Sequence, residues 1–135
     1  MPTKQQVALL STMLDLFKRD NVKLRVRKPR ANSKIDGSFS LRTLVIYLYR
    51  ASPLTVHNVT THDLYVLLHE YRHYQQYLDV FDSDNADCGR PLLSYMAELD
   101  ADVYAIRHLQ EFGVSTEPIE NEIRHRHGFG INIAK

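Results

Sequence analysis

Cysteine is scarce in this sequence, and Cys88 is the only one. A single cysteine cannot form an internal disulfide. We interpret Cys88 as a reduced thiol in a loop, in preference to a nucleophile or an inhibitory zinc ligand.

Long apolar runs and an excess of one charge are absent as well. No apolar run approaches the ~18 residues of a membrane-spanning helix, and no cationic start is followed by an apolar stretch. These absences argue against a membrane partner and predict a cytoplasmic protein. The formal net charge is +1, which provides no global attraction to nucleic acid or to an anionic membrane. Any electrostatic function must therefore be local.

The chain is long enough for one domain. Its 135 residues are 44% hydrophobic and 24% charged, which is ordinary for a soluble globular protein. No repeat or low-complexity segment interrupts it. We expect a single domain over residues 1–135, and the sequence does not indicate its oligomeric state.

The most informative stretch is 60–78, which contains the pattern His-Glu-x-x-His at His69, Glu70 and His73. Thr60 and Asp63 resemble a capping box, and no Gly or Pro follows them before residue 78, so the spacing predicts one helix. Residues four apart lie one above the other on a helix, so His69 and His73 can converge on one ion at about 2 Å from each nitrogen. Glu70 is turned about 100° from His69, which directs it to a water beside the ion, the position of a general base.

A second acidic segment supplies the remaining groups. Glu98 is a candidate third ligand, and two His with one Glu leave a position open for water, as in catalytic zinc sites. Asp102 lies one turn beyond Glu98 and can accept the free N–H of a ligating histidine. Ala101 and Ala105 share that face and let the two helices approach closely.

These residues resemble a known family. His69-Glu70-x-x-His73, followed after 24 intervening residues by Glu98-x-x-Ala-Asp102, resembles the gluzincin metallopeptidases, and is most similar to the compact minigluzincin and ImmA/IrrE-like group. The likeness covers residues 36–112. It implies zinc held by His69, His73 and Glu98, Glu70 as general base, and Asp102 as the partner of a ligating histidine.

The resemblance also implies a fold and a way of binding substrate. It implies a zincin-like domain in which a strand before the helix forms the edge of the cleft and pairs with an extended peptide, a form of β-augmentation. Some minigluzincins are kept latent by a terminal segment. We therefore expect that residues 128–135 can lie near the cleft.

The rest of the chain predicts an α+β protein. Residues 3–19 form a helical candidate with Thr3 and Gln6 as a capping box and an apolar stripe, and residues 22–27 alternate as a strand does. Residues 38–50 are rich in β-branched and aromatic side chains and predict one or two strands. A helix is expected to carry Glu98 and to end at Gly113, and another is expected over 116–127. We expect a small, largely antiparallel sheet packed on the His69/His73 helix, with flanking helices.

A basic stretch is the only hint of a nucleic-acid partner. Six cations fall between residues 23 and 34 without an acid. Because no aromatic residue interleaves with them to stack on bases, we favour a solvated strand face and loop. The rival to a peptidase is a zinc-containing, non-catalytic module on the same scaffold that binds a protein or nucleic acid. Glu70 argues against it, since metal binding alone does not require that carboxylate.

A hydrolase needs a further donor to stabilise the developing oxyanion or to contact substrate. Tyr95, one turn before Glu98, is one candidate, and His125 or His127 near the C-terminus is another. His62, two turns before His69, either lines the cleft or is a surface histidine. The polar segment 79–89 lacks the order of an EF-hand and is interpreted as a loop.

Overall fold

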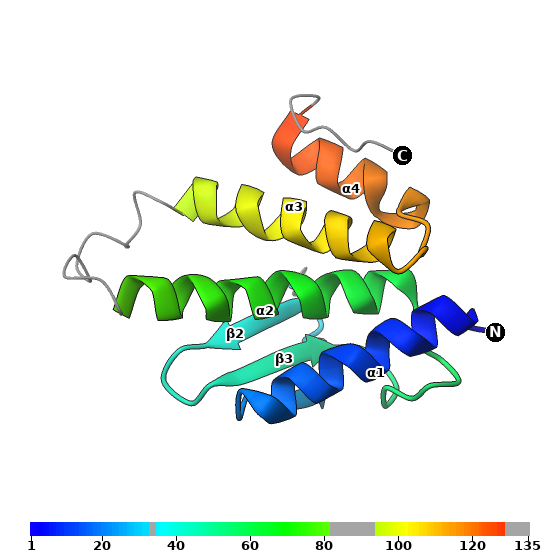
Figure 1. Ribbon diagram of the computed structural model, residues 1–135, viewed down its shortest axis with the longest axis horizontal. Helices are drawn as coiled ribbons and strands as arrows, with labels where there is room; N and C mark the ends of the chain where they lie inside the picture. Colours follow the sequence, from blue (N-terminus) through cyan, green and yellow to red (C-terminus); the bar gives the residue numbers. More distant parts are fainter. Residues whose placement is uncertain (33–34, 82–93, 129–135) are drawn as a thin grey trace.

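The α+β class predicted from the sequence is confirmed by the architecture. The computed structural model describes residues 1–32, 35–81 and 94–128. Within them the elements follow the order α1 (Lys4–Arg19), β1 (Lys23–Arg27), β2 (Gly37–Ser40), β3 (Val45–Tyr49), α2 (Thr61–Phe81), α3 (Ser94–Glu111) and α4 (Glu117–His127). Figure 1 shows α2 and α3 lying side by side along the long axis of the molecule. Among the described residues, no helix is long and apolar enough to cross a membrane.

Helix α1 begins at the predicted capping box. The backbone N–H of Gln6 donates to Oγ1 of Thr3 at 3.1 Å, and the N–H of Thr3 donates to Oε1 of Gln6 at 2.8 Å. Its buried stripe consists of Leu9, Leu10, Met13 and Phe17. Leu14, which the sequence places on the same stripe, is 41% exposed.

The sheet is mixed, so the prediction of a largely antiparallel sheet is wrong. Its strand order is β1-β3-β2, with β3 antiparallel to β2 and parallel to β1. A hairpin joins β2 to β3, and β3 lies between the other two strands. Since β1 and β3 both run opposite to β2, their pairing is parallel. The period of two in the sequence identifies strands but does not determine which strands are neighbours.

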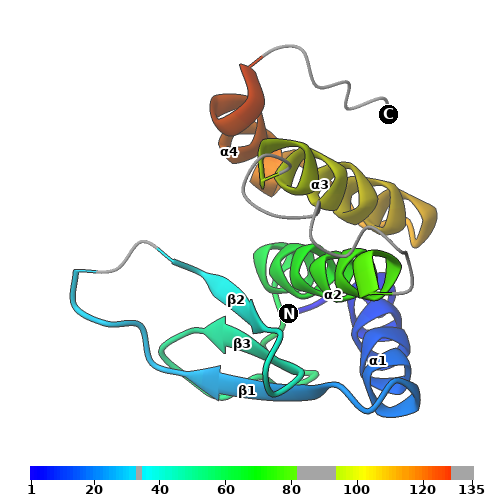
Figure 2. The same ribbon diagram turned by 90° about the vertical axis from the view of Figure 1, so that its left-hand side faces the viewer.

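The helices and the sheet pack in layers through their apolar faces. Figure 2 shows α2 between the sheet on one side and α3 on the other, with α1 beside α2 and α4 beyond α3. Helix α2 packs most extensively against α3. The small side chains of Ala101 and Ala105 are completely buried there, as expected for helices that approach closely.

The ends of α2, α3 and α4 follow local signals. The backbone N–H of Asp63 donates to Oγ1 of Thr60 at 3.1 Å and the N–H of Thr60 donates to Oδ2 of Asp63 at 2.9 Å, which confirms the second capping box. Gly113 follows α3 with φ of 73°, and Gly128 follows α4 with φ of 71°, a conformation that favours glycine. Cys88, most of the polar segment 79–89 and the tail 129–135 lie outside the described residues.

Candidate metal centre

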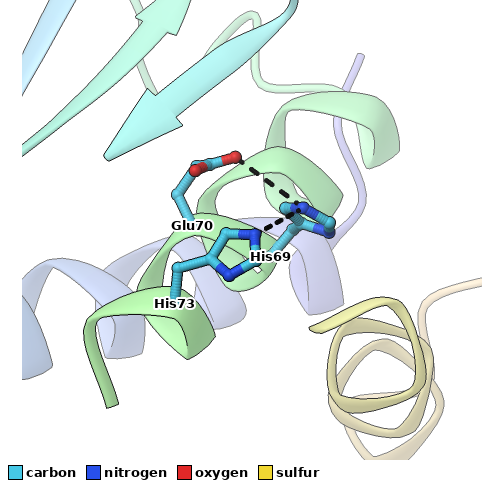
Figure 3. A group of neighbouring side chains, drawn as sticks. All are labelled: His69, Glu70 and His73. Carbon is cyan, nitrogen blue, oxygen red and sulfur yellow. Dashed lines mark hydrogen bonds and ion pairs between the residues drawn. The ribbon is translucent and has the colours of Figure 1, made fainter. Parts of the chain in front are cut away.

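The two histidines of the motif meet on one face of α2. Their Nε2 atoms are 3.1 Å apart, and their rings are nearly perpendicular, at 87°, with centroids 4.7 Å apart. Figure 3 shows both rings on the same side of the helix, with the carboxylate of Glu70 beside the ring of His69. This arrangement is what a spacing of four residues produces on a helix.

Helix α3 brings Glu98 to the same point. Its Oε2 lies 3.0 Å from Nε2 of His69, and its Oε1 lies 3.0 Å from Nε2 of His73. The three residues predicted as ligands are therefore adjacent, although 24 residues separate the two segments that supply them. Their role as ligands stays a prediction.

The outer nitrogens of both histidine rings face acceptors. Nδ1 of His69 lies 2.7 Å from Oδ1 of Asp102, and Nδ1 of His73 lies 2.8 Å from Oε1 of Gln76. An ionised carboxylate can only accept a hydrogen bond. The amide of Gln76 presents its oxygen to His73 because its nitrogen donates to the carbonyl of Ala97 at 3.0 Å and to Asp100 at 2.8 Å. Both rings therefore carry their proton on Nδ1 in the neutral state.

The Nε2 atoms of the two rings then direct their lone pairs towards each other. With Nδ1 protonated, Nε2 of His69 and of His73 are acceptors, and the carboxylate of Glu98 lies against both of them. Three electron-rich groups converge within about 3 Å of one another. Such an arrangement requires a positive charge among them, either a proton or a metal ion.

In the metal-free protein that positive charge is a proton. Burial lowers the pKa of His69, but the carboxylates of Asp102 and Glu98 outweigh burial and raise this pKa to about 9. The pKa of His73 is also raised, with Glu98 and Gln76 overcoming the effect of burial. Hydrogen bonds from His69 and His73 hold the pKa of Glu98 far below its usual range. The centre therefore attracts cations.

Asp102 joins three helices. Its side chain is completely buried, and Oδ1 accepts from the hydroxyl of Tyr65 at 2.6 Å as well as from His69. Oδ2 accepts from Nε2 of His127 at 2.6 Å and from Arg126 at 3.1 Å. Burial raises its pKa, but the bonds from His69 and Tyr65 outweigh burial and lower it. Asp102 thus stays ionised and fixes the orientation of the His69 ring.

A second chain of polar contacts fixes His73. Asp100 accepts from Nε2 of Gln76 at 2.8 Å and from Nε of Arg72 at 2.7 Å. The amide of Gln76 is therefore held in place by α3, and its oxygen orients the ring of His73. Arg72, which occupies a variable position of the motif, links α2 to α3.

Glu70 is buried beside the centre. Its side chain is 10% exposed, and its Oε2 lies 3.9 Å from Nε2 of His69. Within the described residues its carboxylate accepts no hydrogen bond. Burial raises its pKa, and the nearby charges of His69 and His73 oppose this only in part. A carboxylate with a raised pKa and free acceptor atoms is suited to take a proton.

The predicted donors occupy different environments. His127 is only 1% exposed at its side chain, and its Nε2 is engaged by Asp102, so its predicted role in contacting an oxyanion or substrate is not supported by this geometry. Its other ring nitrogen, Nδ1, is buried without a partner among the described residues. Tyr95 is 61% exposed and its ring lies 5.9 Å from that of His127. Tyr95 stays a prediction, whereas His125 is exposed on α4.

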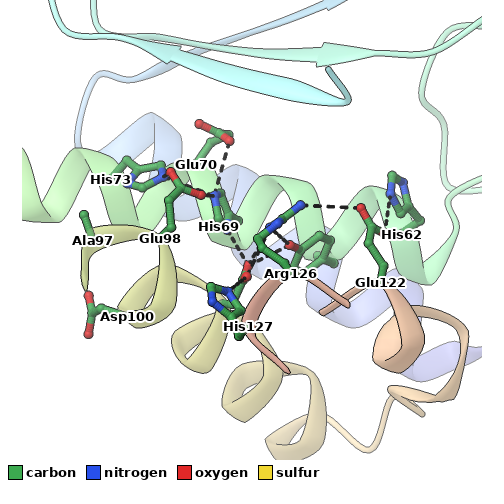
Figure 4. Close-up of polar contacts among 12 residues, drawn as sticks. His62, His69, Glu70, His73, Ala97, Glu98, Asp100, Glu122, Arg126 and His127 are labelled. Atoms are coloured by element: carbon green, nitrogen blue, oxygen red, sulfur yellow. Dashed lines mark hydrogen bonds and ion pairs between the residues drawn. The ribbon is translucent and has the colours of Figure 1, made fainter. Parts of the chain in front are cut away.

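His62 lies away from the centre. Its Nε2 is 3.2 Å from Asp36 and 3.4 Å from Glu122, so it links the start of α2 to α4 and to the residue before β2. Figure 4 shows this contact separated from His69 and His73 by the side chain of Arg126. His62 is 39% exposed, in agreement with the surface alternative considered for it.

Sequence reasoning missed three residues that support the centre. Tyr65 precedes His69 by four residues and Gln76 follows His73 by three, so helical spacing alone could have indicated both. Arg126 could not have been found in this way, because α4 brings it from 24 residues beyond Asp102. Its Nη1 also donates to the hydroxyl of Tyr65 at 2.7 Å.

The comparisons with known proteins provide no family for this chain. No protein-family model matches it, and neither the curated proteins nor the solved structures contain a match. The assignment of the centre therefore depends on its own geometry.

The donor set fits a zinc ion. Two imidazole nitrogens and one carboxylate are the ligands of an open, catalytic type of zinc site. Their tautomers and orientation are set by Asp102 and Gln76 before any ion binds. His69, His73 and Glu70 also have donor atoms within 4.8 Å of one another, which places the free carboxylate next to the ligands.

Proposed function

We propose that this chain is a zinc-dependent metallopeptidase of the gluzincin type, with His69, His73 and Glu98 as zinc ligands and Glu70 as the general base. One observation carries the proposal: Nε2 of both histidines and the carboxylate of Glu98 converge at 3.0–3.1 Å, and beside them lies Glu70, which accepts no hydrogen bond among the described residues. A site built only for structure has no use for that fourth group, because it lies outside the ligand set.

Zinc held by these residues supplies Lewis acidity towards water and towards the carbonyl of a peptide bond. Glu70 takes a proton from the attacking water and transfers it to the leaving amine. Burial suits Glu70 to both steps, because it raises the pKa of the carboxyl towards the working pH. Asp102 and Gln76 keep the histidine rings in the ligating tautomer throughout.

Strand β2 is the part of the sheet that suits an extended substrate. It is an edge strand, since β3 separates it from β1. At its start, a Cβ added to Gly37 would lie 3.5 Å from Cγ of Glu70, so the strand passes directly beside the proposed base. An extended peptide that paired with β2 by main-chain hydrogen bonds would run past Glu70. The substrate proposed is therefore a protein or peptide in extended conformation, and a cytoplasmic location stays a prediction from the sequence.

The proposal is tested by hydrolysis in isotopically labelled water. Zinc-loaded full-length chain is incubated with a diverse peptide library in H2(18)O, and products are analysed by mass spectrometry. New carboxyl ends that carry one (18)O are expected, and a chelator should abolish them. Absence of any cleavage at full zinc occupancy would contradict a peptidase and favour the non-catalytic binding module.

A further inference from the structure

The two faces of the sheet differ in composition. One face is covered by α2, and the other points away from it. Leu24 and Val26 of β1 lie opposite Ile46 and Leu48 of β3, and these side chains belong to the apolar core or pack against it. The alternate positions form what we call the outer face. It consists of Lys23, Arg25 and Arg27 of β1, Val45, Tyr47 and Tyr49 of β3, and Ser38 and Ser40 of β2.

Parallel pairing puts cations next to aromatic rings on the outer face. Arg25 is opposite Tyr47, and Arg27 is opposite Tyr49. The guanidinium of Arg27 lies 5.2 Å from the centroid of the Tyr47 ring. The basic stretch has no aromatic residues of its own, but β3 supplies them from 20 residues further along the chain. The reason for disfavouring a nucleic-acid partner from the sequence therefore does not hold in the folded protein.

The nearly parallel rings of Tyr47 and Tyr49 form what we call the platform. Their planes differ by only 16° and their centroids are 6.4 Å apart. They occupy alternate positions of one strand, so both stand on the same side of the sheet. Two nearly parallel, stacked rings on one side of the sheet offer π-faces on which unpaired bases can stack.

The platform is surrounded by cations. Within the part of the chain that the structure describes, Lys23, Arg25, Arg27, Lys28 and Arg30 form no ion pair. A hollow of about 630 Å3 is lined by Val26, Arg27, Lys28, Arg30, Tyr47 and Tyr49. The local charge is therefore strongly positive although the chain carries a net charge of only +1.

We propose that the outer face binds single-stranded nucleic acid, with Tyr47 and Tyr49 stacking on adjacent bases and Arg25, Arg27, Lys28 and Arg30 contacting phosphates. Unneutralised cations select a polyanion. The partly exposed rings of Tyr47 and Tyr49 select a polyanion with unpaired, planar bases, because bases within a duplex are already stacked on one another. An acidic peptide would satisfy the cations but would leave the platform unused.

This proposal does not depend on the peptidase assignment. Helix α2 lies between the sheet and α3 (Figure 2), and the metal centre is built from α2 and α3. The outer face is the side of the sheet that points away from α2, so the two sites lie on opposite sides of the sheet. A Glu70→Gln variant should therefore bind nucleic acid as the wild type does. Loss of one function leaves the test of the other intact.

The electrostatic part is tested by fluorescence anisotropy. Full-length protein is titrated into fluorescein-labelled oligo-dT and oligo-U of about 15 nucleotides, a length within the range covered by one small domain, at several salt concentrations. Four phosphate contacts predict that log K falls against log salt with a slope of about −3, and Arg25→Gln with Arg27→Gln should reduce its magnitude by about 1.4. Lys4→Gln with Lys18→Gln, exposed on α1, removes the same charge and should leave the slope unchanged.

The stacking part is tested by removing the rings. Tyr47→Leu with Tyr49→Leu should weaken oligonucleotide binding by about tenfold or more, while Tyr47→Phe with Tyr49→Phe retains it within about twofold. Binding of inorganic polyphosphate, which has charge but no bases, should be equal in all three proteins. Tighter binding of oligo-U or of oligo-dT identifies RNA or DNA as the ligand and supports the proposal in either case.

Three results would overturn the proposal. The first is no oligonucleotide binding at about 50 mM salt, where phosphate contacts are strongest. The second is equal binding by wild type and the folded leucine pair, since the platform would then have no role. The third is polyglutamate competing as well as oligo-dT does, because the outer face would then bind acidic polypeptide.

Discussion

His69 and Asp102 are joined by a hydrogen bond of 2.7 Å between Nδ1 of the ring and Oδ1 of the carboxylate. The bond crosses from α2 to α3 at a place where Asp102 has no contact with solvent. It fixes which nitrogen of His69 carries the proton, and so directs the lone pair of Nε2 towards His73 and Glu98.

Replacing Asp102 with alanine should weaken zinc binding without abolishing it. The ligands remain, but the His69 ring loses its orientation and three other donors lose their acceptor. Affinity or activity should fall about 10- to 100-fold, measured by competition with a zinc indicator. Asp15→Ala, exposed on α1, is the control and should bind zinc as the wild type does. Unchanged affinity in Asp102→Ala would contradict the orienting role.

Removing any ligand should remove the metal. His69→Ala, His73→Ala and Glu98→Ala are each expected to lose stoichiometric zinc and the stability that zinc contributes, because only the folded state assembles the site. Metal content after gel filtration measures the first effect, and thermal melts with and without zinc measure the second. His57→Ala and Glu111→Ala change the same residue types at exposed positions and should retain zinc. Full occupancy in Glu98→Ala would overturn the ligand assignment.

The metal-free protein should become less stable as the pH rises from about 6.5 to about 9. The pKa of His69 is raised in the folded protein to about 9 from its ordinary value of 6.5. The stability that the protonated ring contributes is therefore fully present below pH 6.5 and is lost as the pH rises through about 9. His73 contributes with the same sign, because its pKa is raised too. His69 alone should account for roughly 3 kcal/mol of this loss.

Urea denaturation at a series of pH values, in the presence of a chelator, measures this loss. The zinc-loaded protein is the comparison, and it should not lose stability over the same range, because a metal ion replaces the proton among the lone pairs. A metal-free stability that is flat or rises between these pH values would show that the histidines and Glu98 do not need a shared positive charge.

Gly37→Ala should displace β2 from α2. A Cβ at this position would lie 2.3 Å from Cγ1 of Val66 and 3.0 Å from the carbonyl oxygen of Tyr47, so the strand must shift. Overpacking of this kind costs about 1–3 kcal/mol, measured by chemical denaturation. Ser38→Ala, one residue along, adds no atoms and is the control. Equal stability of the two variants would show that β2 does not pack closely on α2 beside Glu70.

The sequence predicted the elements better than their arrangement. The capping boxes at Thr3 and Thr60 and the terminating glycine at position 113 are local signals, and the helix boundaries followed them closely. The neighbours of β3 depend on the path of the chain between strands, which no periodicity records.

The same distinction holds for the centre. His69, His73, Glu98 and Asp102 were found because spacing on two helices brings each pair to one face. Arg126 and the contact of His127 with Asp102 were not predicted, because they depend on where α4 lies in the folded chain.

The variable positions of the motif also have structural explanations that spacing could not supply. Tyr71 is buried in the core, and its hydroxyl donates to Asp20 at 2.5 Å, at the end of α1. Its ring lies 5.5 Å from that of Phe17. Tyr71 therefore connects α2 to α1 through a hydrogen bond and a ring contact. It does not take part in the metal centre.

Glu70→Gln separates a catalyst from a binding module most directly. The substitution keeps the size and shape of the side chain but removes the proton acceptor, and it touches no hydrogen bond among the described residues. Zinc content, peptide binding and cleavage are measured on the same preparation. We predict unchanged zinc and peptide binding, with cleavage reduced by at least ~10² to 10⁴, the usual share of general acid–base catalysis. Cleavage at the wild-type rate with full zinc occupancy would contradict the assignment of Glu70 as the base and with it the proposed mechanism.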